Sequence, residues 1–521
     1  MRLHADLGSL FPDPVCIEGN LTCIPVETSL KKRSVQGVLW NAFGSYSHKG
    51  LQIVVSAILS RLLSPQDYGI MAMVLVLSGF MSIFPEAALI PAIVQHQDLD
   101  NKDLSSICWF GLCLGFLMFL IMAGCSPYIA LFYKTPILRP VATVMGLTFL
   151  FQAPGEIPLA LLQRQLNFKS ISFIRLISAL CAAIVAVYLA LTGAGYWALV
   201  IQHIVYAACC GLLFFYAAKW LPAFSFQLKS IQKVFRYSTD ITSFSAINYW
   251  ARNADNILIG KFWGSSMLGY YSHAYNLMLA PLCLINQVIN PVLHSALARI
   301  QENRVQVRVA FLQVVKYISM VCFPLVIVQA FLAPEIVQTL WGKQWSPCIR
   351  VFRILSSVGL VQPVVSSTDI VFQACNRTDM LLKIGTINAI AICAGIVSGL
   401  SWGMSGVAIG YSIGYGMIVV PTLYAAISVV LGGSLQELFA VVAWPALMAA
   451  CAGLSLAVWN RLFRGMLPAF FHAAGGGACA GAVSLMVLGI FDRPSLSELS
   501  SSIMPSKSEE RNDTGTERIY S

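Results

Sequence analysis

Long apolar segments alternate with short polar ones along almost the whole chain of 521 residues. The apolar segments reach about 20 residues and lack the strict alternation of barrel strands, so each predicts a helix that spans a bilayer. About fourteen such helices are expected. They cover residues 37–60, 68–94, 105–126, 137–162, 171–192, 196–218, 241–262, 268–293, 310–332, 352–374, 381–401, 405–430, 437–459 and 468–490.

Composition supports a membrane protein. Hydrophobic residues make up 57% of the chain and charged residues 11%, whereas soluble domains carry about 25% charged residues. Because lipid offers no hydrogen bonds to an open backbone, only helices or closed barrels can span it. The prediction is therefore an all-α polytopic protein.

The net charge of +10 comes mostly from Lys and Arg in the short loops, where basic residues orient a membrane protein. With the N-terminus inside, the inside loops hold about twice as many basic residues as the outside loops. Arg164, Lys169 and Arg175 are among those assigned to the inside. An even number of helices places the C-terminus inside too. Nucleic acid is not an expected partner.

The two halves of the chain repeat each other. Arg61-Leu-Leu-Ser-Pro-Gln-Asp-Tyr-Gly69 aligns with Lys261-Phe-Trp-Gly-Ser-Ser-Met-Leu-Gly269. Further along, Gln152, Gln163, Gly193 and Ala198 align with Gln362, Gln373, Gly403 and Ala408. Six helices separate the members of each pair, so the repeats are parallel and related by an axis along the membrane normal.

This repeat sets the expected domain organisation. Residues 34–219 and 241–430 form two six-helix bundles, and residues 220–240 form a cytoplasmic linker between them. Residues 431–490 add two further helices. The remaining segments are a cytoplasmic N-terminal tail, residues 1–33, and a disordered cytoplasmic tail, residues 491–521.

Charged side chains within the predicted spans are the candidate site, since such charges are costly in lipid and usually face a cavity. His48 and Lys49 lie near the middle of the first helix, and Arg252 and Asp255 lie in the seventh, its repeat partner. These four residues are the candidate ligands for an anionic substrate. The alternative is that Arg252 and Asp255 only neutralise each other.

Three more carboxylates lie within predicted spans. Glu156 is in the fourth helix, Asp369 in its repeat partner, the tenth, and Glu86 in the second. They are candidates for coupling to an ion, and the alternative is that they are buried and protonated.

Two other patterns bear on packing and chemistry. Glycines recur every four residues at Gly406, Gly410 and Gly414, which predicts a face where helices pack closely. The chain has no GxxxxGK[ST] or HExxH motif. No catalytic residue, cofactor or metal site is predicted, and the chain is not expected to be an enzyme.

Several separated motifs, in order, resemble one family. The run ending in Arg61-Leu-Leu-Ser-Pro-Gln-Asp-Tyr-Gly69 resembles the first extracytoplasmic loop of bacterial oligosaccharide flippases. Asn253-Ala-Asp255-Asn-Ile-Leu-Ile-Gly260 is similar to that family's seventh helix. The resemblance covers about residues 34–430 and is to the polysaccharide transport family of the multidrug/oligosaccharidyl-lipid/polysaccharide exporter superfamily.

This resemblance implies a function in the bacterial inner membrane. Such a protein moves a lipid-linked oligosaccharide, carried on undecaprenyl diphosphate, to the periplasmic leaflet for exopolysaccharide, capsule or lipopolysaccharide synthesis. A polymerase or export complex is then an expected partner. Two alternatives stay open, a drug antiporter of the same superfamily and a membrane-embedded polysaccharide polymerase, although every loop is short for an enzyme.

Overall fold

The computed structural model describes residues 26–95, 100–165, 167–224, 249–250, 252–283, 303–463 and 466–491, with residues 227, 297 and 300. All regular secondary structure in this part of the chain is helical. Residues 1–25, residues 492–521 and most of the predicted linker lie outside the described residues. The domain boundaries therefore stay predictions.

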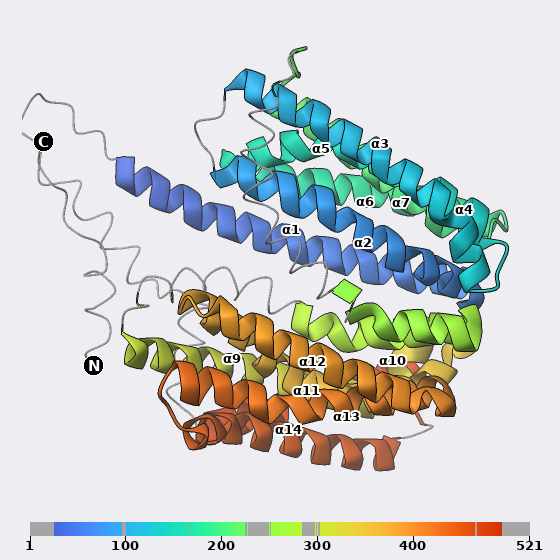
Figure 1. Ribbon diagram of the computed structural model, residues 1–521. Helices are drawn as coiled ribbons and strands as arrows, with labels where there is room; N and C mark the ends of the chain where they lie inside the picture. The colour runs from blue at the N-terminus through green and yellow to red at the C-terminus, as the bar shows by residue number, and fades with distance from the viewer. Residues whose placement is uncertain are drawn as a thin grey trace, which may run out of the picture.

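The described helices form two groups (Figure 1). The first group contains α1 (Val26–Leu62), α2 (Pro65–Gln95), α3 (Asn101–Phe132), α4 (Leu138–Met145), α5 (Leu147–Arg164), α6 (Phe168–Leu191) and α7 (Tyr196–Ala218). The second contains helical residues 252–283, α9 (Arg304–Phe331), α10 (Ala333–Leu340), η1 (Lys343–Trp345), α11 (Pro347–Ala374), α12 (Thr378–Gly399), η2 (Leu400–Trp402), α13 (Gly403–Tyr424), η3 (Ala425–Val430), α14 (Leu435–Phe463) and α15 (Ala469–Phe491). The groups diverge on the left of the view and converge on the right.

The lengths and composition of these helices confirm the predicted class of a polytopic all-α protein. Ten segments of the described residues are long and apolar enough to cross a membrane, and one of them, Asp379–Val430, comprises both α12 and α13. Residues 252–283 are helical throughout, and Gly264 within this run has a φ of +81°, which lies outside the usual right-handed helical region. The number of about fourteen spans stays a prediction, because parts of the chain are not described.

Local sequence explains where α2 begins. The backbone N–H of Ser64 donates to Asp67 Oδ2 at 2.9 Å, and the N–H of Asp67 points back to Ser64 Oγ at 3.3 Å. This reciprocal arrangement is a capping box, and Pro65 has no N–H to leave unsatisfied at the first helical position. Because Ser64 N–H donates to Asp67, the Ser60 carbonyl at the end of α1 is available to other donors.

The backbone preserves the repeat at equivalent turns. Gly193, before α7, has a φ of +82°, and Gly403, at the start of α13, has a φ of +71°. These glycines were paired by sequence alone, and both adopt a conformation that side-chain-bearing residues avoid.

The two halves meet most closely where α1 ends and α2 begins, which we call the closed end. A Cβ atom on Gly69 would lie 1.7 Å from the Ser265 carbonyl oxygen, and one on Gly269 would lie 2.0 Å from that of Pro65. The two backbones therefore touch at glycines that occupy equivalent positions in the repeat. Only glycine permits this approach.

Basic residues reinforce the contact reciprocally. Arg61, from the first half, donates to the carbonyl oxygens of Thr339 and Leu340 at the end of α10. Lys261, from the second half, donates to the carbonyl of Phe132 at the end of α3 and lies 4.1 Å from the centre of that residue's ring. The aligned basic residues thus each bind the end of a helix in the other half.

Glycines also hold α12 against α13. A Cβ atom on Gly410 would lie 2.0 Å from the Gly395 carbonyl oxygen, and one on Gly406 would lie 2.3 Å from that of Gly399. The predicted close-packing face is confirmed.

Replacing Gly410 with Ala is expected to destabilise the protein by about 1–3 kcal/mol, because the new methyl group meets backbone that cannot turn aside. Gly416→Ala, on the same helix, is the matched control, since nothing lies within 4 Å of its added Cβ. The midpoint of thermal unfolding of the purified protein measures the effect. Equal midpoints for the two variants would contradict the packing role.

Candidate functional site

Two adjoining cavities run along the first group of helices. One, of about 550 Å³, is lined by α1, α2, α6 and α7 and by residues 272, 273, 276 and 341 of the second half, and we call it the closed-end cavity. The other, of about 620 Å³, is lined by α1, α2, α5, α6 and α7 and contains Arg175, and we call it the Arg175 cavity. His48, Leu75, His203 and Tyr206 line both, so the two spaces meet there.

The closed-end cavity combines polar and apolar side chains, and its basic groups are the histidines His48, His203 and His273. Its polar lining includes Gln52, Gln202, Ser272 and Asn276, and none of the described residues that line it is Asp, Glu, Lys or Arg. The rings of Tyr68 and Trp341 add aromatic surface. Neutral hydrogen-bonding groups beside aromatic rings fit a neutral polar ligand.

The Arg175 cavity contains a cation and a carboxylic acid. Arg175, on α6, lies close enough to His48 and Tyr206 to interact with both electrostatically. Glu156, on α5, is 4% exposed, and its Oε1 accepts a hydrogen bond from Gln152 Nε2 at 3.1 Å. This cavity can therefore hold an anion at Arg175.

His48 lies at the junction of the two cavities. Its ring packs against that of Tyr206, with centroids 5.9 Å apart, and its Nε2 lies 3.0 Å from Gln52 Nε2. Its buried Nδ1 has no hydrogen-bond partner among the described residues. The imidazole is thus available to a ligand that passes between the cavities.

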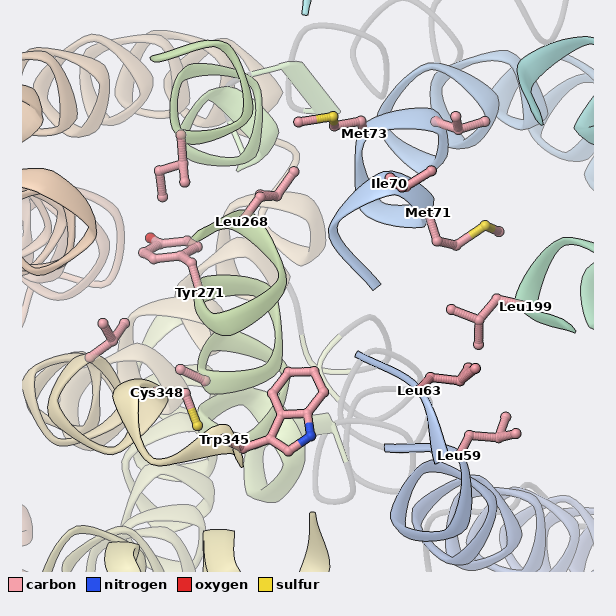
Figure 2. Close-up of a cluster of buried hydrophobic side chains, with 14 of the residues drawn as sticks. Leu59, Leu63, Ile70, Met71, Met73, Leu199, Leu268, Tyr271, Trp345 and Cys348 are labelled. Atoms are coloured by element: carbon pink, nitrogen blue, oxygen red, sulfur yellow. The ribbon is translucent and has the colours of Figure 1, made fainter. Parts of the chain in front are cut away.

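At the closed end, side chains of the second half bind the end of α1. The Ser60 carbonyl accepts hydrogen bonds from Gln344 Nε2 at 2.6 Å and from Trp345 Nε1 at 2.8 Å. Gln344 also donates to the Leu63 carbonyl at 3.1 Å. These donors satisfy helix-end carbonyls that have no partner within the helix. Figure 2 shows Trp345 in the same apolar cluster as Leu59 of α1, Leu63 in the turn after α1, and Ile70 of α2.

His273 is buried in this closure. Its Nε2 lies 3.1 Å from Ser60 Oγ, and its ring stacks on Trp345 with centroids 4.0 Å apart. Tyr68 and Trp341 meet the same ring edge-on. The closure is therefore a shared cluster of aromatic rings and hydrogen bonds, and it forms one wall of the closed-end cavity.

The second half buries Asp255 among tyrosines. Its Oδ2 accepts a hydrogen bond from Tyr271 Oη at 2.9 Å, and its Oδ1 accepts one from the backbone N–H of Asn256 at 2.7 Å. Tyr271 stacks on Tyr275, whose hydroxyl lies 3.4 Å from that of Tyr411. Asp255 is only 1% exposed and lines neither cavity.

The other residues singled out by sequence are dispersed. Lys49 is partly buried and lines neither cavity, although His48 beside it lines both. Arg252 is exposed and interacts electrostatically with Asp369, which is also exposed. Glu86 lies within α2, but its side chain is not described. The structure thus brings His48 and Glu156 to one cavity, and Arg252 and Asp369 to a separate place.

Sequence reasoning missed Arg175, His203, Tyr206 and His273. Arg175 was assigned to an inside loop, whereas it lies in the second turn of α6 and lines a cavity. The signal in the sequence was the position of Arg175 close to the boundary of a predicted span, where a cation can lie within the helix. Across the described residues, no group of three or more His, Cys, Asp or Glu is placed to hold a metal ion.

Two relatives found by sequence comparison are both named as biosynthesis proteins. The lipopolysaccharide biosynthesis protein WzxC of Escherichia coli (strain K12) is 25% identical over 416 residues, 78% of this chain and 84% of that protein. The teichuronic acid biosynthesis protein TuaB of Bacillus subtilis (strain 168) is 27% identical over 355 residues, 68% of this chain and 73% of that protein.

Solved structures share the fold. The lipid II flippase MurJ, in an inward closed conformation, matches with a TM-score of 0.71 at 15% identity, over 88% of this chain and all of that chain. An inward-facing multidrug resistance MATE family transporter of the MOP superfamily matches with a TM-score of 0.58 at 13% identity, over 76% of this chain and 95% of that chain. These likenesses confirm the expected architecture.

A family model described as "Polysaccharide biosynthesis protein" matches residues 58–350. This region includes both copies of the repeated loop, Arg61 to Gly69 and Lys261 to Gly269, and most of the residues that line the two cavities. Because it makes up more than half of the chain, and because the helices cross a membrane many times, the protein is a multi-pass membrane protein that belongs to the polysaccharide biosynthesis protein family.

Proposed function

We propose that this protein is a flippase that moves lipid-linked oligosaccharide repeat units across the inner membrane for surface polysaccharide synthesis. The observation that carries the proposal is the pair of adjoining polar cavities, which run within one half and end beneath a closure made by both halves. The family and the lipopolysaccharide and teichuronic acid relatives support it.

The chemistry of the cavities matches the parts of such a substrate. The diphosphate of an undecaprenyl-diphosphate carrier is anionic and binds at Arg175 and His48, because a guanidinium can pair with phosphate oxygens through two hydrogen bonds. The sugars occupy the closed-end cavity, where amides, hydroxyls and aromatic rings surround them. The lipid tail stays in the bilayer.

Transport then requires the closed end to open. The hydrogen bonds to Ser60 and Leu63 exchange for bonds to water, so opening costs much less than their full strength. A substrate drives the change only if it binds the two conformations with different affinity. No bond is made or broken, so the action is movement between leaflets rather than catalysis.

Orientation follows from the basic loops. With the N- and C-termini in the cytoplasm, the closed end lies on the periplasmic side. The Arg175 cavity then lies nearer the cytoplasm, where lipid-linked precursors are assembled. A polysaccharide polymerase or export complex receives the product on the other side.

The remaining candidate residues keep their proposed roles beside Arg175. Lys49, Arg252 and Asp255 contribute to substrate binding in a conformation other than this closed one. Glu156, Asp369 and Glu86 are the candidates for ion coupling, and the side chain of Glu156 lines the Arg175 cavity.

Arg175→Ala is expected to lower surface polysaccharide output about 10- to 100-fold, because a hydrogen bond to a charged group contributes about 1.5–3 kcal/mol. Lys169→Ala is the matched control, since Lys169 is a cation on the same helix that lines neither cavity. Polymer output per unit of membrane-inserted protein is the measurement. Normal output from Arg175→Ala would exclude the proposed anion site.

Lys49→Ala and Arg252→Ala are each expected to reduce polymer output while protein levels stay normal. The reason is that a cation in a membrane span is retained at a cost only where a ligand or partner uses it. Quantifying surface polysaccharide and membrane-inserted protein in both strains checks this. Unchanged output in both would remove these two residues from the substrate path.

A further inference from the structure

The short helix α10 packs against two parts of the molecule. Ala333 and Val337 are fully buried and belong to the apolar cluster that contains Leu59 of α1 and Leu63, which follows α1. Leu332, which immediately precedes α10, belongs to a different cluster, with Ala452, Leu456 and Ala480 of α14 and α15. The α10 segment therefore packs against the closure on one side and against the C-terminal helices on the other.

The polar contacts of α10 are also made both to the closure and to the C-terminal helices. The carbonyls of Thr339 and Leu340, at the end of α10, accept hydrogen bonds from Arg61 of α1. One turn earlier, Glu335 Oε1 lies 3.6 Å from Nδ1 of His472 on α15. The chain then runs directly from α10 into Trp341, Gln344 and Trp345, the residues that pack on His273 or cap α1.

The Glu335–His472 pair is unusually placed. The His472 side chain is 3% exposed and that of Glu335 is 18% exposed. Neither nitrogen of His472 nor Oε2 of Glu335 has a hydrogen-bond partner among the described residues. The Glu335 carboxylate is the polar side chain that the structure places beside the buried His472 ring, and without it the imidazole would be left uncompensated in an apolar setting.

The C-terminal helices hold His472 rigidly. Trp459 of α14 donates its Nε1 hydrogen to the His472 carbonyl at 3.2 Å. A Cβ atom on Gly475 would lie 2.6 Å from Trp459 Cζ2, so α15 packs directly on that indole ring. Trp459 of α14 thus holds the His472 backbone beside α10.

We propose that Glu335 and His472 are positioning residues for the periplasmic closure, which they control through α10. In this view α14 and α15, which lie outside the two six-helix repeats, act as a support that sets how firmly the closed end stays shut. The inference rests on the proposed alternation between closed and open conformations. It does not depend on the identity of the glycan.

The test measures closure without substrate. A parent protein carries Leu63→Cys and Gln344→Cys, at positions joined by a hydrogen bond across the closed end. The rate at which a short bifunctional thiol reagent joins them in isolated membranes, corrected for the native cysteines, reports the closed population. Glu335→Gln and His472→Asn, which remove the carboxylate or the imidazole with little change of volume, are each expected to lower that rate at least threefold.

One control variant and one double variant distinguish a positioning role of Glu335 and His472 from a general destabilisation of the C-terminal helices. Glu437 of α14 pairs with Arg308 of α9 at 3.3 Å, so Glu437→Gln removes a different ion pair of the same C-terminal helices. It is expected to leave the rate unchanged. Exchanging the partners, as Glu335→His with His472→Glu, is expected to restore at least half of the lost rate.

Two results would overturn the proposal. One is a parental cross-linking rate in both Glu335→Gln and His472→Asn. The other is an equal loss in Glu437→Gln, which would indicate that any weakening of the C-terminal helices has the same effect. Failure of polysaccharide export with normal cross-linking in these variants would count against this inference but not against the flippase function.

Discussion

The contact on which the structure depends is the approach of two backbones at Gly69 and Gly269. Each glycine lies against a carbonyl of the other half, so the second helices of the two repeats touch without intervening side chains. The Arg61 and Lys261 contacts and the aromatic cluster around His273 are built around this approach. Each half therefore contributes the same two contacts, a glycine against a backbone carbonyl and a basic side chain bound to the end of a helix.

The closed end bounds the cavities on one side. The polar space lies within the first half, whereas the second half contributes a wall at the closed end and buries its own carboxylate, Asp255, under Tyr271. The two cavities differ in charge, because Arg175 and Glu156 line one of them, whereas no Asp, Glu, Lys or Arg is among the described residues that line the other. A substrate with an anionic carrier and a sugar head group has a matching division, which is why the proposed function and the fold fit one another.

Much of the fold was predictable from sequence, but less of the site was. Apolar length identified the spans, and the aligned loops at Arg61 and Lys261 identified the repeat, because these are local properties of the chain. The site depends on which helix faces meet. Successive residues point about 100° apart around a helix, so His48 faces the cavities and Lys49 does not. His273 resembles any histidine of an apolar span until Trp345, far along the chain, stacks on it.

The central claim is that the closed end must open for transport. It is tested most directly by joining Leu63→Cys to Gln344→Cys with an oxidant in living cells and following surface polysaccharide. We predict that output stops when the disulfide forms, returns when a reductant cleaves it, and does not respond to the oxidant in either single-cysteine variant. Continued export with the two halves fully cross-linked at this point would contradict it.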